Sequence, residues 1–395
     1  MMQTDDRIRN RLHQSVSKLK SYIEEQEYRG YDPYDALKSP LLNNPFIKRI
    51  PVVSFLAQQL IKRLPLNLRP VLGIGKGLNP VTLGLCIQGY TSLGKAGILS
   101  KNEVVSINSG LIDLLVSLIP VGYRGSCWGY DFPWQSRYFR VEAYQPSIVA
   151  TGIITNALFQ YLKFSDDEKA KNLIVSSAAF VMHDLKRLDN TETGFCFSYT
   201  PFDTYPVYNA SMKAVRLLVQ AWSLSGNEEY LKTARQACSY VMNKQNSDGS
   251  WFYSASESGK WIDSYHTGYV LDCADEFSKI TNIHDFDSFI SHGYRYFETH
   301  FSLENGFPAF FHNRKYPIDC TAASQVILTL IHFGNTEKAI QSALFTIENM
   351  QSDQGNFYFR KFEKSVRKEP FMRWSDAWMF AALSELLAMT GSKNA

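Results

Sequence analysis

A glycine followed closely by an aromatic residue recurs along the sequence, and this repeat limits the possible folds more than any other feature. The motif stands at Gly129, Gly194, Gly249, Gly306 and Gly355, so successive glycines are 65, 55, 57 and 49 residues apart. Glycine is expected at such points because tight turns often require a positive φ angle. A period of about 50 residues is typical of proteins built from repeated supersecondary units. The chain is therefore predicted to consist of such units.

Each interval between these glycines contains two helical patterns of different character. The first carries few charges, which is typical of a helix buried on most sides. The second carries charges on one face and apolar residues at i, i+3 and i+4 on the other. Each unit is thus predicted to be a hairpin of an inner and an outer helix. The predicted inner helices span Ser147–Tyr161, Asn209–Leu224, Thr267–Phe277, Thr321–Phe333 and Ala377–Met389, and the outer helices span Lys169–Leu188, Glu228–Lys244, Phe286–His300 and Thr336–Met350.

The N-terminal third is less regular, but it adds predicted helices at Arg7–Glu27, Val52–Leu64, Pro80–Leu93 and Ser106–Ile119. With these, about six hairpins fit the chain, and stacked hairpins form either an open solenoid or a closed ring. The inner helices are too apolar to line an open concave surface, which favours closure. We therefore predict an all-α fold, a single (α/α)6 toroid over residues 1–395 with short aromatic β-segments at its rim. Residues 1–120 form its less regular part.

Charge and composition argue against several classes of function. Lys and Arg number 41 and Asp and Glu 38, so the net charge of +3 gives no general argument for nucleic-acid binding. The N-terminus has no apolar signal region, and the longest apolar stretch, Leu111–Val121, is shorter than a membrane span and contains Asp113. The six cysteines form no C-x-x-C pair, as expected for reduced thiols. We expect a cytoplasmic protein without a membrane span, a metal or a cofactor, and its oligomeric state stays open.

The segments that lead into the predicted inner helices are rich in aromatic and polar side chains, in a chain with 7 Trp, 22 Tyr and 26 Phe. In a ring these segments meet at one mouth, where aromatic faces and fixed hydrogen-bonding groups suit a sugar. The expected catalytic residues are Asp263, His266, Asp319, Asp376 and Tyr208. The expected substrate-binding residues are Trp128, Asp131, Trp134, Arg137, Glu142, Tyr144, Asn209, Trp261, Tyr265, Arg314, Arg373 and Trp374.

Each of these residues also has a purely structural interpretation. Asp263, Asp319 and Asp376 stand where a carboxylate commonly caps a helix, and Asn209 shares this ambiguity. The rim tryptophans could plug the barrel, and His266 could be an ordinary packed histidine. What favours a site is that five successive units bring the same combination of side chains to one rim.

Three kinds of activity remain open from the residues alone. Glycoside hydrolysis needs two carboxyl groups, ~5–5.5 Å apart for retention or ~6.5–9.5 Å apart for inversion. Asp131, Glu142, Asp263, Asp319 and Asp376 are the candidates. Epimerisation or elimination on a uronate needs a base and an acid, drawn from Tyr144, Tyr208, Tyr265 and His266, with Arg137, Arg140, Arg314 or Arg373 beside the carboxylate. A glycan-binding protein would need the aromatic side chains but no acid and base.

Several segments carry a resemblance to a known superfamily. Gln245–Trp251 and Gln351–Phe357 resemble the Q-x-x-x-G-x-W turn of α/α-toroid enzymes, and the chain as a whole resembles the six-hairpin glycosidase-like superfamily. Through Gly30–Asp35, Pro206–Ser211 and Arg373–Trp378 it is similar to toroid proteins associated with bacterial exopolysaccharide and capsule synthesis. The first of these segments also resembles the glucuronyl C5-epimerase group.

This resemblance implies an enzyme that processes an oligosaccharide or polysaccharide substrate, with a uronate favoured by the rim arginines, by hydrolysis or by epimerase or lyase chemistry. It does not name the reaction, because one fold supports many chemistries. The alternative is a noncatalytic glycan-binding or polysaccharide-assembly factor. A third is a terpenoid cyclase-like protein, which shares the Q-x-x-x-G-x-W turn, although the D-x-D-D acid motif of that family is missing from the sequence.

Overall fold

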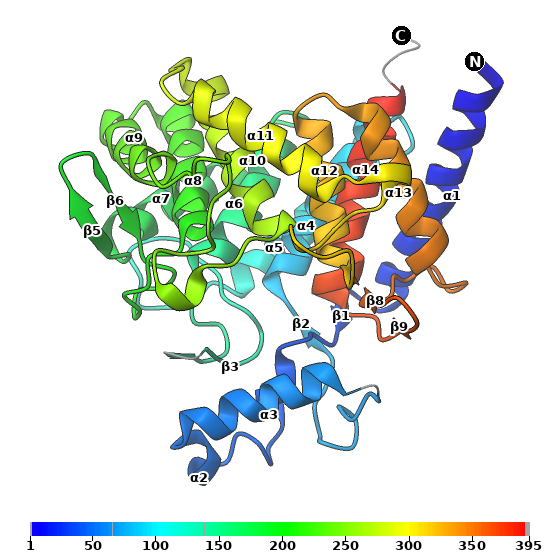
Figure 1. Ribbon diagram of the computed structural model, residues 1–395, viewed down its shortest axis with the longest axis horizontal. Helices are drawn as coiled ribbons and strands as arrows, with labels where there is room; N and C mark the ends of the chain where they lie inside the picture. Colours follow the sequence, from blue (N-terminus) through cyan, green and yellow to red (C-terminus); the bar gives the residue numbers. More distant parts are fainter. Residues whose placement is uncertain (1, 65, 137–138, 392–395) are drawn as a thin grey trace.

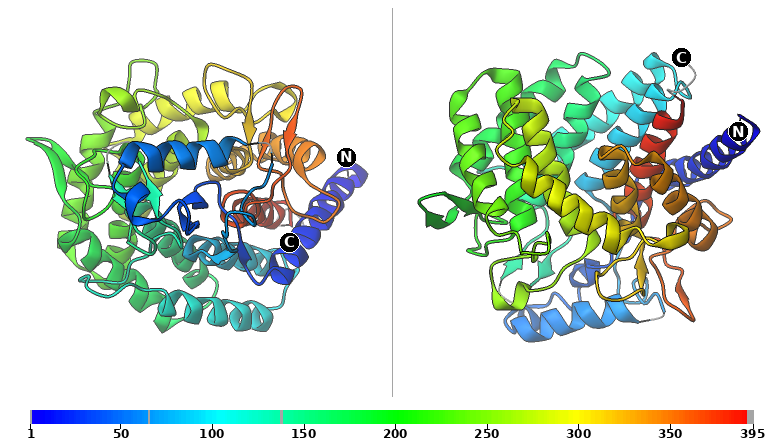
Figure 2. Two further views of the ribbon diagram at one scale, coloured as in Figure 1. Left: turned by 90° about the horizontal axis from the view of Figure 1, so that it is seen from below. Right: turned by 45° about the horizontal axis from the view of Figure 1, so that its top comes forward.

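The computed structural model describes residues 2–64, 66–136 and 139–391. Within these residues, six inner helices stand around a central axis, each packed against the next, and the last packs against the first. Figure 2 shows this ring end-on. The inner helices are α4 (Pro80–Lys95), α6 (Ile148–Leu162), α8 (Tyr208–Ser225), α10 (Ser264–Thr281), α12 (Cys320–His332) and α14 (Trp378–Gly391).

A second layer of helices surrounds the ring, and each outer helix packs on an inner one (Figure 1). Five of them follow their inner partners in sequence, whereas α1, at the N-terminal end, packs on α14. The last hairpin therefore joins the two ends of the chain, and the predicted (α/α)6 toroid is confirmed. The outer helices are α1 (Met2–Glu25), α5 (Lys101–Ser117), α7 (Glu168–His183), α9 (Glu228–Met242), α11 (Asp287–Phe301) and α13 (Thr336–Met350).

The two layers differ in burial in the way that their charge patterns predict. In α6, 12 of the 15 residues are buried, because the helix contacts neighbours on almost every side. In α13 the buried residues form one stripe at helical spacing, which is the face that packs on α12 and α14. The members of that stripe are Ala339, Ser342, Ala343, Thr346 and Met350.

Four of the repeated glycines lie at turns that press against the outer helix of the following hairpin. Gly194, Gly249, Gly306 and Gly355 have φ angles of 150°, 94°, 73° and 99°. A Cβ atom at Gly194 would lie 2.0 Å from the carbonyl oxygen of Gln236 in α9. The other three turns press in the same way on α11, α13 and α1. Glycine is required at these turns by both the backbone conformation and the close contact.

The first member of this series is Gly125, and not Gly129 as the sequence pattern suggested. A Cβ atom at Gly125 would lie 1.9 Å from the carbonyl oxygen of Ser176 in α7, which matches the other four turns. Gly129 instead approaches the carbonyl oxygen of Gln145, in the loop before α6. The pattern selected Gly129 because Tyr130 follows it directly.

Short antiparallel strands connect the hairpins. The predicted outer helix Lys169–Leu188 was too long, because α7 ends at His183 and the chain then pairs as a hairpin of β5 (Arg187–Thr191) and β6 (Gly194–Phe197). The other described pairs are β1 (Arg29–Gly30) with β2 (Gly77–Leu78), β3 (Trp134–Gln135) with β4 (Arg140–Val141), and β7 (Ile318–Asp319) with β8 (Arg360–Lys361), which also pairs with β9 (Val366–Arg367).

A small helical lobe lies outside the ring. It contains α2 (Pro45–Lys48) and α3 (Pro51–Arg63), and it packs on the short 3-10 helix Asp35–Lys38 and on β3. Figure 2 shows α3 crossing one end of the ring. The predicted helix at Val52–Leu64 therefore exists, but it is not part of a hairpin.

We expect Gly306→Ala to destabilise the fold by ~2–4 kcal/mol, because it combines an unfavourable φ angle with a clash. A Cβ atom there would lie 2.3 Å from the backbone of Gln341. Urea unfolding would measure the loss. Gly334→Ala is the matched control, since Gly334 has φ 78° but no atom within 4 Å of a Cβ, and it should cost only ~1 kcal/mol. Equal losses in the two variants would contradict the role of the helix contact.

Candidate active site at the mouth of the ring

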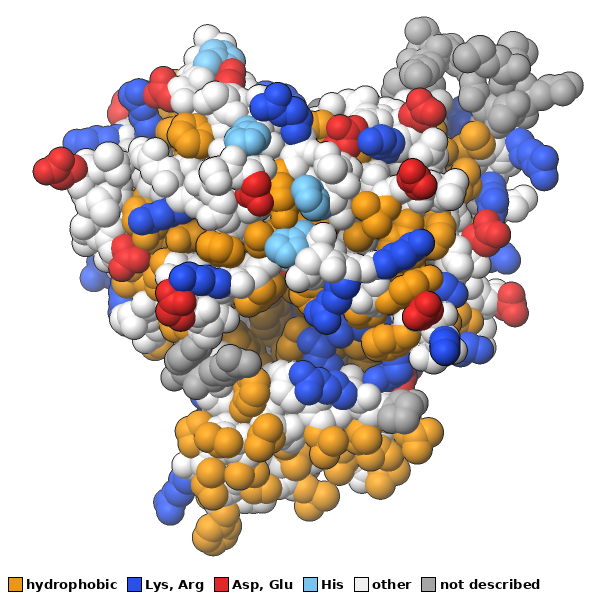
Figure 3. Space-filling model, viewed as in Figure 1, with side chains coloured by type: hydrophobic (Ala, Val, Ile, Leu, Met, Phe, Trp, Pro, Cys, Tyr) orange, Lys and Arg blue, Asp and Glu red, His pale blue; other side chains and the backbone are white. Residues whose placement is uncertain are grey.

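A cavity of about 450 Å³ lies at the end of the ring where the inner helices begin. Figure 3 shows the molecule hollowed there, between the ring and the lobe. The lining comes from the first turns of α6, α8, α10, α12 and α14 and from the loops before them, as the ring prediction required. Among the described lining residues are Tyr34, Tyr130, Tyr199, Tyr205, Tyr253, Tyr265, Tyr269, Trp134, Trp261, Trp374 and Trp378.

His266 is the histidine of the described lining, and Asp263 holds it in place. Asp263 is the N-cap of α10: its Oδ1 accepts a hydrogen bond from the backbone N–H of His266 at 2.9 Å, and its Oδ2 lies 2.7 Å from His266 Nδ1. A carboxylate at Nδ1 favours the tautomer with the proton on that nitrogen, which leaves the Nε2 lone pair available. The Asp–His pair therefore has the geometry of an oriented base.

Aromatic rings fix the plane of the imidazole. The ring centroid of His266 lies 4.0 Å from that of Tyr265, 4.7 Å from Tyr253 and 5.2 Å from Trp261. Tyr253 and Trp261 are themselves stacked, with centroids 4.4 Å apart. The side chain has little freedom to turn away from the cavity.

Burial holds several tyrosines of the lining in the neutral, proton-donating form. Burial raises the pKa of Tyr265 and Tyr269 well above the usual range, and neighbouring carboxylates and tyrosines add to the effect at Tyr265. Burial also raises the pKa of Tyr34 to about 12. These hydroxyls can therefore donate hydrogen bonds or protons, but they are poor bases.

Arg373 supplies a positive charge to the same cavity. It lies in a π-helical turn, Met372–Ala377, that precedes α14, and its Nε donates to Asp32 Oδ2 at 2.6 Å. Its guanidinium carbon lies 4.6 Å from the ring centroid of Tyr130. A guanidinium has five N–H donors and the ion pair engages Nε, so the terminal groups remain able to bind an anionic ligand.

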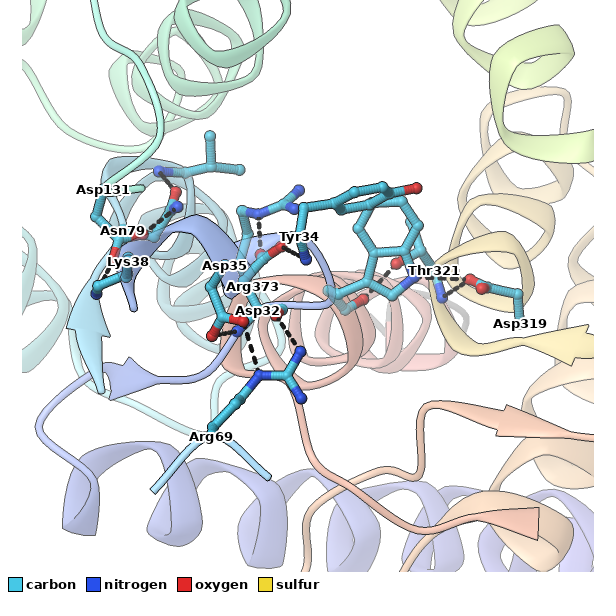
Figure 4. Close-up of polar contacts among 12 residues, drawn as sticks. Asp32, Tyr34, Asp35, Lys38, Arg69, Asn79, Asp131, Asp319, Thr321 and Arg373 are labelled. Carbon is cyan, nitrogen blue, oxygen red and sulfur yellow. Dashed lines mark hydrogen bonds and ion pairs between the residues drawn. The ribbon is translucent and has the colours of Figure 1, made fainter. Parts of the chain in front are cut away.

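The segment Gly30–Asp35 positions Arg373, as Figure 4 shows. The backbone N–H of Asp32 donates to Asp35 Oδ2, and the N–H of Tyr34 donates to Asp32 Oδ1, so the segment is tied into a compact turn. Asp35 in turn pairs with the buried Arg69 at 2.7 Å. The segments Gly30–Asp35 and Arg373–Trp378, which both carry the sequence resemblance, thus meet at the ion pair between Asp32 and Arg373.

Asn209 is buried in the first turn of α8 and lines the cavity. Its Nδ2 has no hydrogen-bond partner among the described residues. Buried amide donors are nearly always paired, so this group is suited to bind a ligand oxygen.

Charged groups fill the barrel interior below the cavity. Trp378 and Ile153 line both the cavity and a smaller space of about 70 Å³ that contains Lys213, Arg216, Asp272 and Glu276. The ammonium of Lys213 lies 3.6 Å from the ring centroid of Tyr269, and burial lowers the pKa of Lys213 to about 7. The inner helices are therefore apolar where they contact one another and polar along the axis.

Of the five residues expected to be catalytic, His266 lines the cavity, Asp263 lies behind it, and the other three have different surroundings. Asp319 caps α12, pairs with Arg360 at 2.6 Å and accepts from Trp374 Nε1 at 2.9 Å, so it supports a lining tryptophan from behind. Asp376 is fully buried and accepts from the backbone N–H of Phe357, and burial raises its pKa well above the usual range. Tyr208 packs against Tyr240 between α8 and α9.

The expected substrate-binding residues divide in the same way. Trp134, Asn209, Trp261, Tyr265, Arg373 and Trp374 line the cavity. The others lie elsewhere: Trp128 is buried and donates to the carbonyl of Leu115, Asp131 binds Lys38 and Asn79, Glu142 binds Lys48 and Arg140, Tyr144 is at the surface, and Arg314 lies over Phe311. Arg137 lies outside the described residues.

Several lining residues were not among the candidates. Tyr269 and Trp378 lie four residues after Tyr265 and Trp374, one helical turn deeper into the barrel. Extending the helical spacing from the rim would have found them. Tyr199 and Tyr253 follow the repeated glycine turns, and Tyr34 comes from the irregular N-terminal part.

The described residues contain no group of three or more His, Cys, Asp or Glu side chains arranged to hold a metal ion. None of their helices combines the length and the apolarity that a membrane crossing requires. The six cysteines are buried free thiols.

Comparisons with known proteins agree on the fold. No protein-family model and no curated protein matches the sequence. Among solved structures, cellobiose 2-epimerase from Bacillus thermoamylovorans has a TM-score of 0.59 at 10% identity, covering 79% of this chain and 87% of that chain. A GH76 α-mannanase from Bacteroides thetaiotaomicron has a TM-score of 0.57 at 14% identity, covering 78% and 86%. A D-mannose isomerase has a TM-score of 0.56 at 10% identity, covering 79% and 87%. At these identities the likeness establishes the toroid fold alone.

Proposed function

We propose that this protein is a carbohydrate-processing enzyme that moves a carbon-bound proton of a saccharide, as uronate epimerases and lyases do. The observation that carries the proposal is the chemistry of the cavity. Its described lining combines one imidazole, seven tyrosines and one guanidinium, and no carboxylate. A two-carboxyl hydrolase would need a pair of carboxyl groups facing the scissile bond. Asp131, Glu142, Asp263, Asp319 and Asp376 are all engaged behind the lining or away from it.

In this proposal His266 Nε2 takes the proton from the carbon next to the sugar carboxylate. The C–H bond breaks, its electron pair becomes an enolate, and Arg373 balances the negative charge that develops. A tyrosine hydroxyl then acts as the acid. Tyr130 is the first candidate because its ring lies beneath the guanidinium of Arg373. Donation to the opposite face of the carbon gives epimerisation, whereas donation to the departing oxygen, as its bond to carbon breaks, gives elimination.

The comparisons support a sugar substrate, since the similar structures include a cellobiose 2-epimerase, an α-mannanase and a D-mannose isomerase. They do not select the reaction, because they span several chemistries. A role in bacterial exopolysaccharide synthesis remains part of the proposal and rests on the sequence resemblance. A cytoplasmic location also remains part of it and rests on the cysteine pattern.

The aromatic lining gives some support to a terpenoid cyclase-like function, because aromatic faces stabilise cations. Starting such a reaction by protonation requires a strong acid, and the lining described above offers no carboxylic acid. We therefore favour the saccharide.

The test is incubation with uronate-containing and neutral oligosaccharides in deuterated water, followed by NMR. We expect one of two changes at the carbon next to the carboxylate of the uronate: deuterium replaces its hydrogen, or the hydrogen is lost as a new double bond forms. The neutral sugar should show neither change. Exchange without cleavage identifies an epimerase, and an unsaturated product identifies a lyase. Cleavage to saturated products without exchange would contradict the proposal in favour of a hydrolase, and line broadening alone would contradict it in favour of a binding protein.

A further inference from the structure

An exposed apolar surface covers the lobe that carries α2 and α3. Of the 16 large apolar side chains exposed among the described residues, nine lie between residues 41 and 71. Phe46, Leu66 and Val71 are 81%, 69% and 82% exposed. Figure 3 shows these side chains gathered on the lower face of the molecule, and we call them the lobe face. Soluble proteins rarely leave so many apolar side chains together in water, which marks an interaction surface.

Helix α3 is amphipathic in the reverse sense of an ordinary surface helix. Its polar side chains Ser54 and Gln58 are buried, whereas Val52, Leu56 and Leu60 are 66%, 58% and 59% exposed. The inward orientation is fixed by hydrogen bonds. Ser54 donates to the carbonyl of Ile47, and the side chain of Gln58 exchanges two hydrogen bonds with the backbone of Gln135. The apolar side therefore points outward because the polar side is anchored to the body.

The charge around the lobe face is mainly positive, although Lys48 pairs with Glu142 at 2.7 Å and Glu363 is exposed in the turn between β8 and β9. No Asp or Glu occurs between Asp35 and Glu103, whereas residues 41–76 contain six Lys or Arg. Of these, Lys48, Arg49, Arg63 and Lys76 are exposed. The turn between β8 and β9 adds the exposed Lys364, and Arg367 fastens it to the end of α3 by donating to the carbonyl of Arg63 at 2.9 Å. The apolar surface is thus bordered by positive charge.

We propose that the lobe face docks on the surface of an anionic phospholipid bilayer, with α3 lying in the plane of the headgroups. Apolar side chains on one face with Lys and Arg at its border are the features of helices that bind at this interface. A second copy of the chain fits less well, because a face-to-face contact would bring two mainly positive borders together. Docking here would put the bilayer at the end of the ring where the cavity lies. The proposal does not depend on the chemistry of that cavity.

Sedimentation with vesicles tests this proposal. The whole protein should bind vesicles of phosphatidylcholine with phosphatidylglycerol, should bind pure phosphatidylcholine much less, and should be released by salt. The double variant L56E/L60E should lower the binding constant at least ~tenfold, because it places charge in the interfacial layer. Arg49→Gln or Arg63→Gln should lower it about fivefold each, since each basic side chain near the surface contributes about 1 kcal/mol.

The matched control is L114E/V121E, which makes the same charge change at two other exposed apolar positions, 38% and 94% accessible. It should bind vesicles like the unmodified protein, and circular dichroism should show both double variants folded. Absence of binding to the anionic vesicles would overturn the proposal. So would a concentration-dependent dimer in analytical ultracentrifugation that L56E/L60E dissociates, because the lobe face would then be a contact between two copies.

Discussion

Replacement of His266 by glutamine is expected to lower kcat by ~10²–10⁴-fold, the usual contribution of a general base, with little change in KM. Glutamine fills similar space and can still form hydrogen bonds, but it cannot take up a proton. The measurement is the initial rate of deuterium incorporation into the uronate, or of formation of the unsaturated product. Because the side chain of His266 is only partly buried, the variant should fold, and circular dichroism checks this.

The chain offers a close control for this variant. His284 also has an aspartate three residues away, with its Nδ1 2.9 Å from Asp287 Oδ2, but it is exposed and outside the cavity. His284→Gln should leave the exchange rate unchanged. Full activity in His266→Gln would exclude His266 as the base, and equal losses in both variants would point to a general effect of removing an Asp–His pair.

Asp263 acts through His266, so its variant should have a distinct signature. Asn is also a good N-cap, so Asp263→Asn should preserve the start of α10. It should nevertheless lower kcat by ~10²-fold or more, because the amide no longer selects the tautomer. KM should change little, because Asp263 lies behind the described lining and not in it. An unchanged kcat would indicate that Asp263 only caps the helix.

The ring could be predicted from the sequence because its determinants are local. The inner helices differ from the outer ones in charge along each single helix, and the glycine turns repeat at each junction. Thr336–Met350 was predicted with the bounds that the structure has. Contacts between distant parts of the chain were harder to predict. The pairing of α1 with α14 joins the two ends of the chain, and its trace in the sequence is the turn at Gly355, which presses on Lys18 of α1.

The candidate site was predictable where a side chain stands in the first turn of an inner helix. His266, Asn209 and Tyr265 line the cavity for this reason. The same rule selected Asp376, but the π-helical turn before α14 directs its carboxylate to the backbone of Phe357. A change from α to π spacing shifts every following side chain around the axis, and periodicity does not reveal it.

The ion pair of Arg373 could not be predicted from the sequence, because its two residues are far apart along the chain. Arg373 was a candidate, but its counter-ion, Asp32, is 341 residues away in the sequence. Nothing in a single chain's pattern specifies such a contact. The sequence pattern also predicts that the lobe belongs to the ring, because α3 has helical periodicity. The position of α3 outside the ring depends on the tertiary contacts of Ser54 and Gln58, which periodicity does not reveal.

Arg373→Gln is expected to destabilise the protein by ~3–5 kcal/mol, because it leaves the carboxylate of Asp32 buried without its counter-ion. Both side chains are below 10% exposed, so water cannot replace the lost partner. Urea unfolding measures the effect. Arg235→Gln is the control, since Arg235 pairs with Asp285 at the surface, where such pairs are worth ~0–1 kcal/mol.

Three further variants separate the structural role of Arg373 from its role in binding. The double variant D32N/R373Q should recover part of the lost stability, because no buried charge remains unpaired.

Arg373→Lys keeps the charge beside Asp32 but loses the planar fork, so it should raise KM for a uronate ~tenfold. Its effect on the binding of a neutral oligosaccharide should be small. Asp32→Asn keeps the guanidinium and should retain more uronate affinity than Arg373→Lys. If Arg373→Lys weakened uronate and neutral ligands equally, Arg373 would hold the cavity together without contacting the carboxylate, and the enolate-stabilising role would have to pass to another cation.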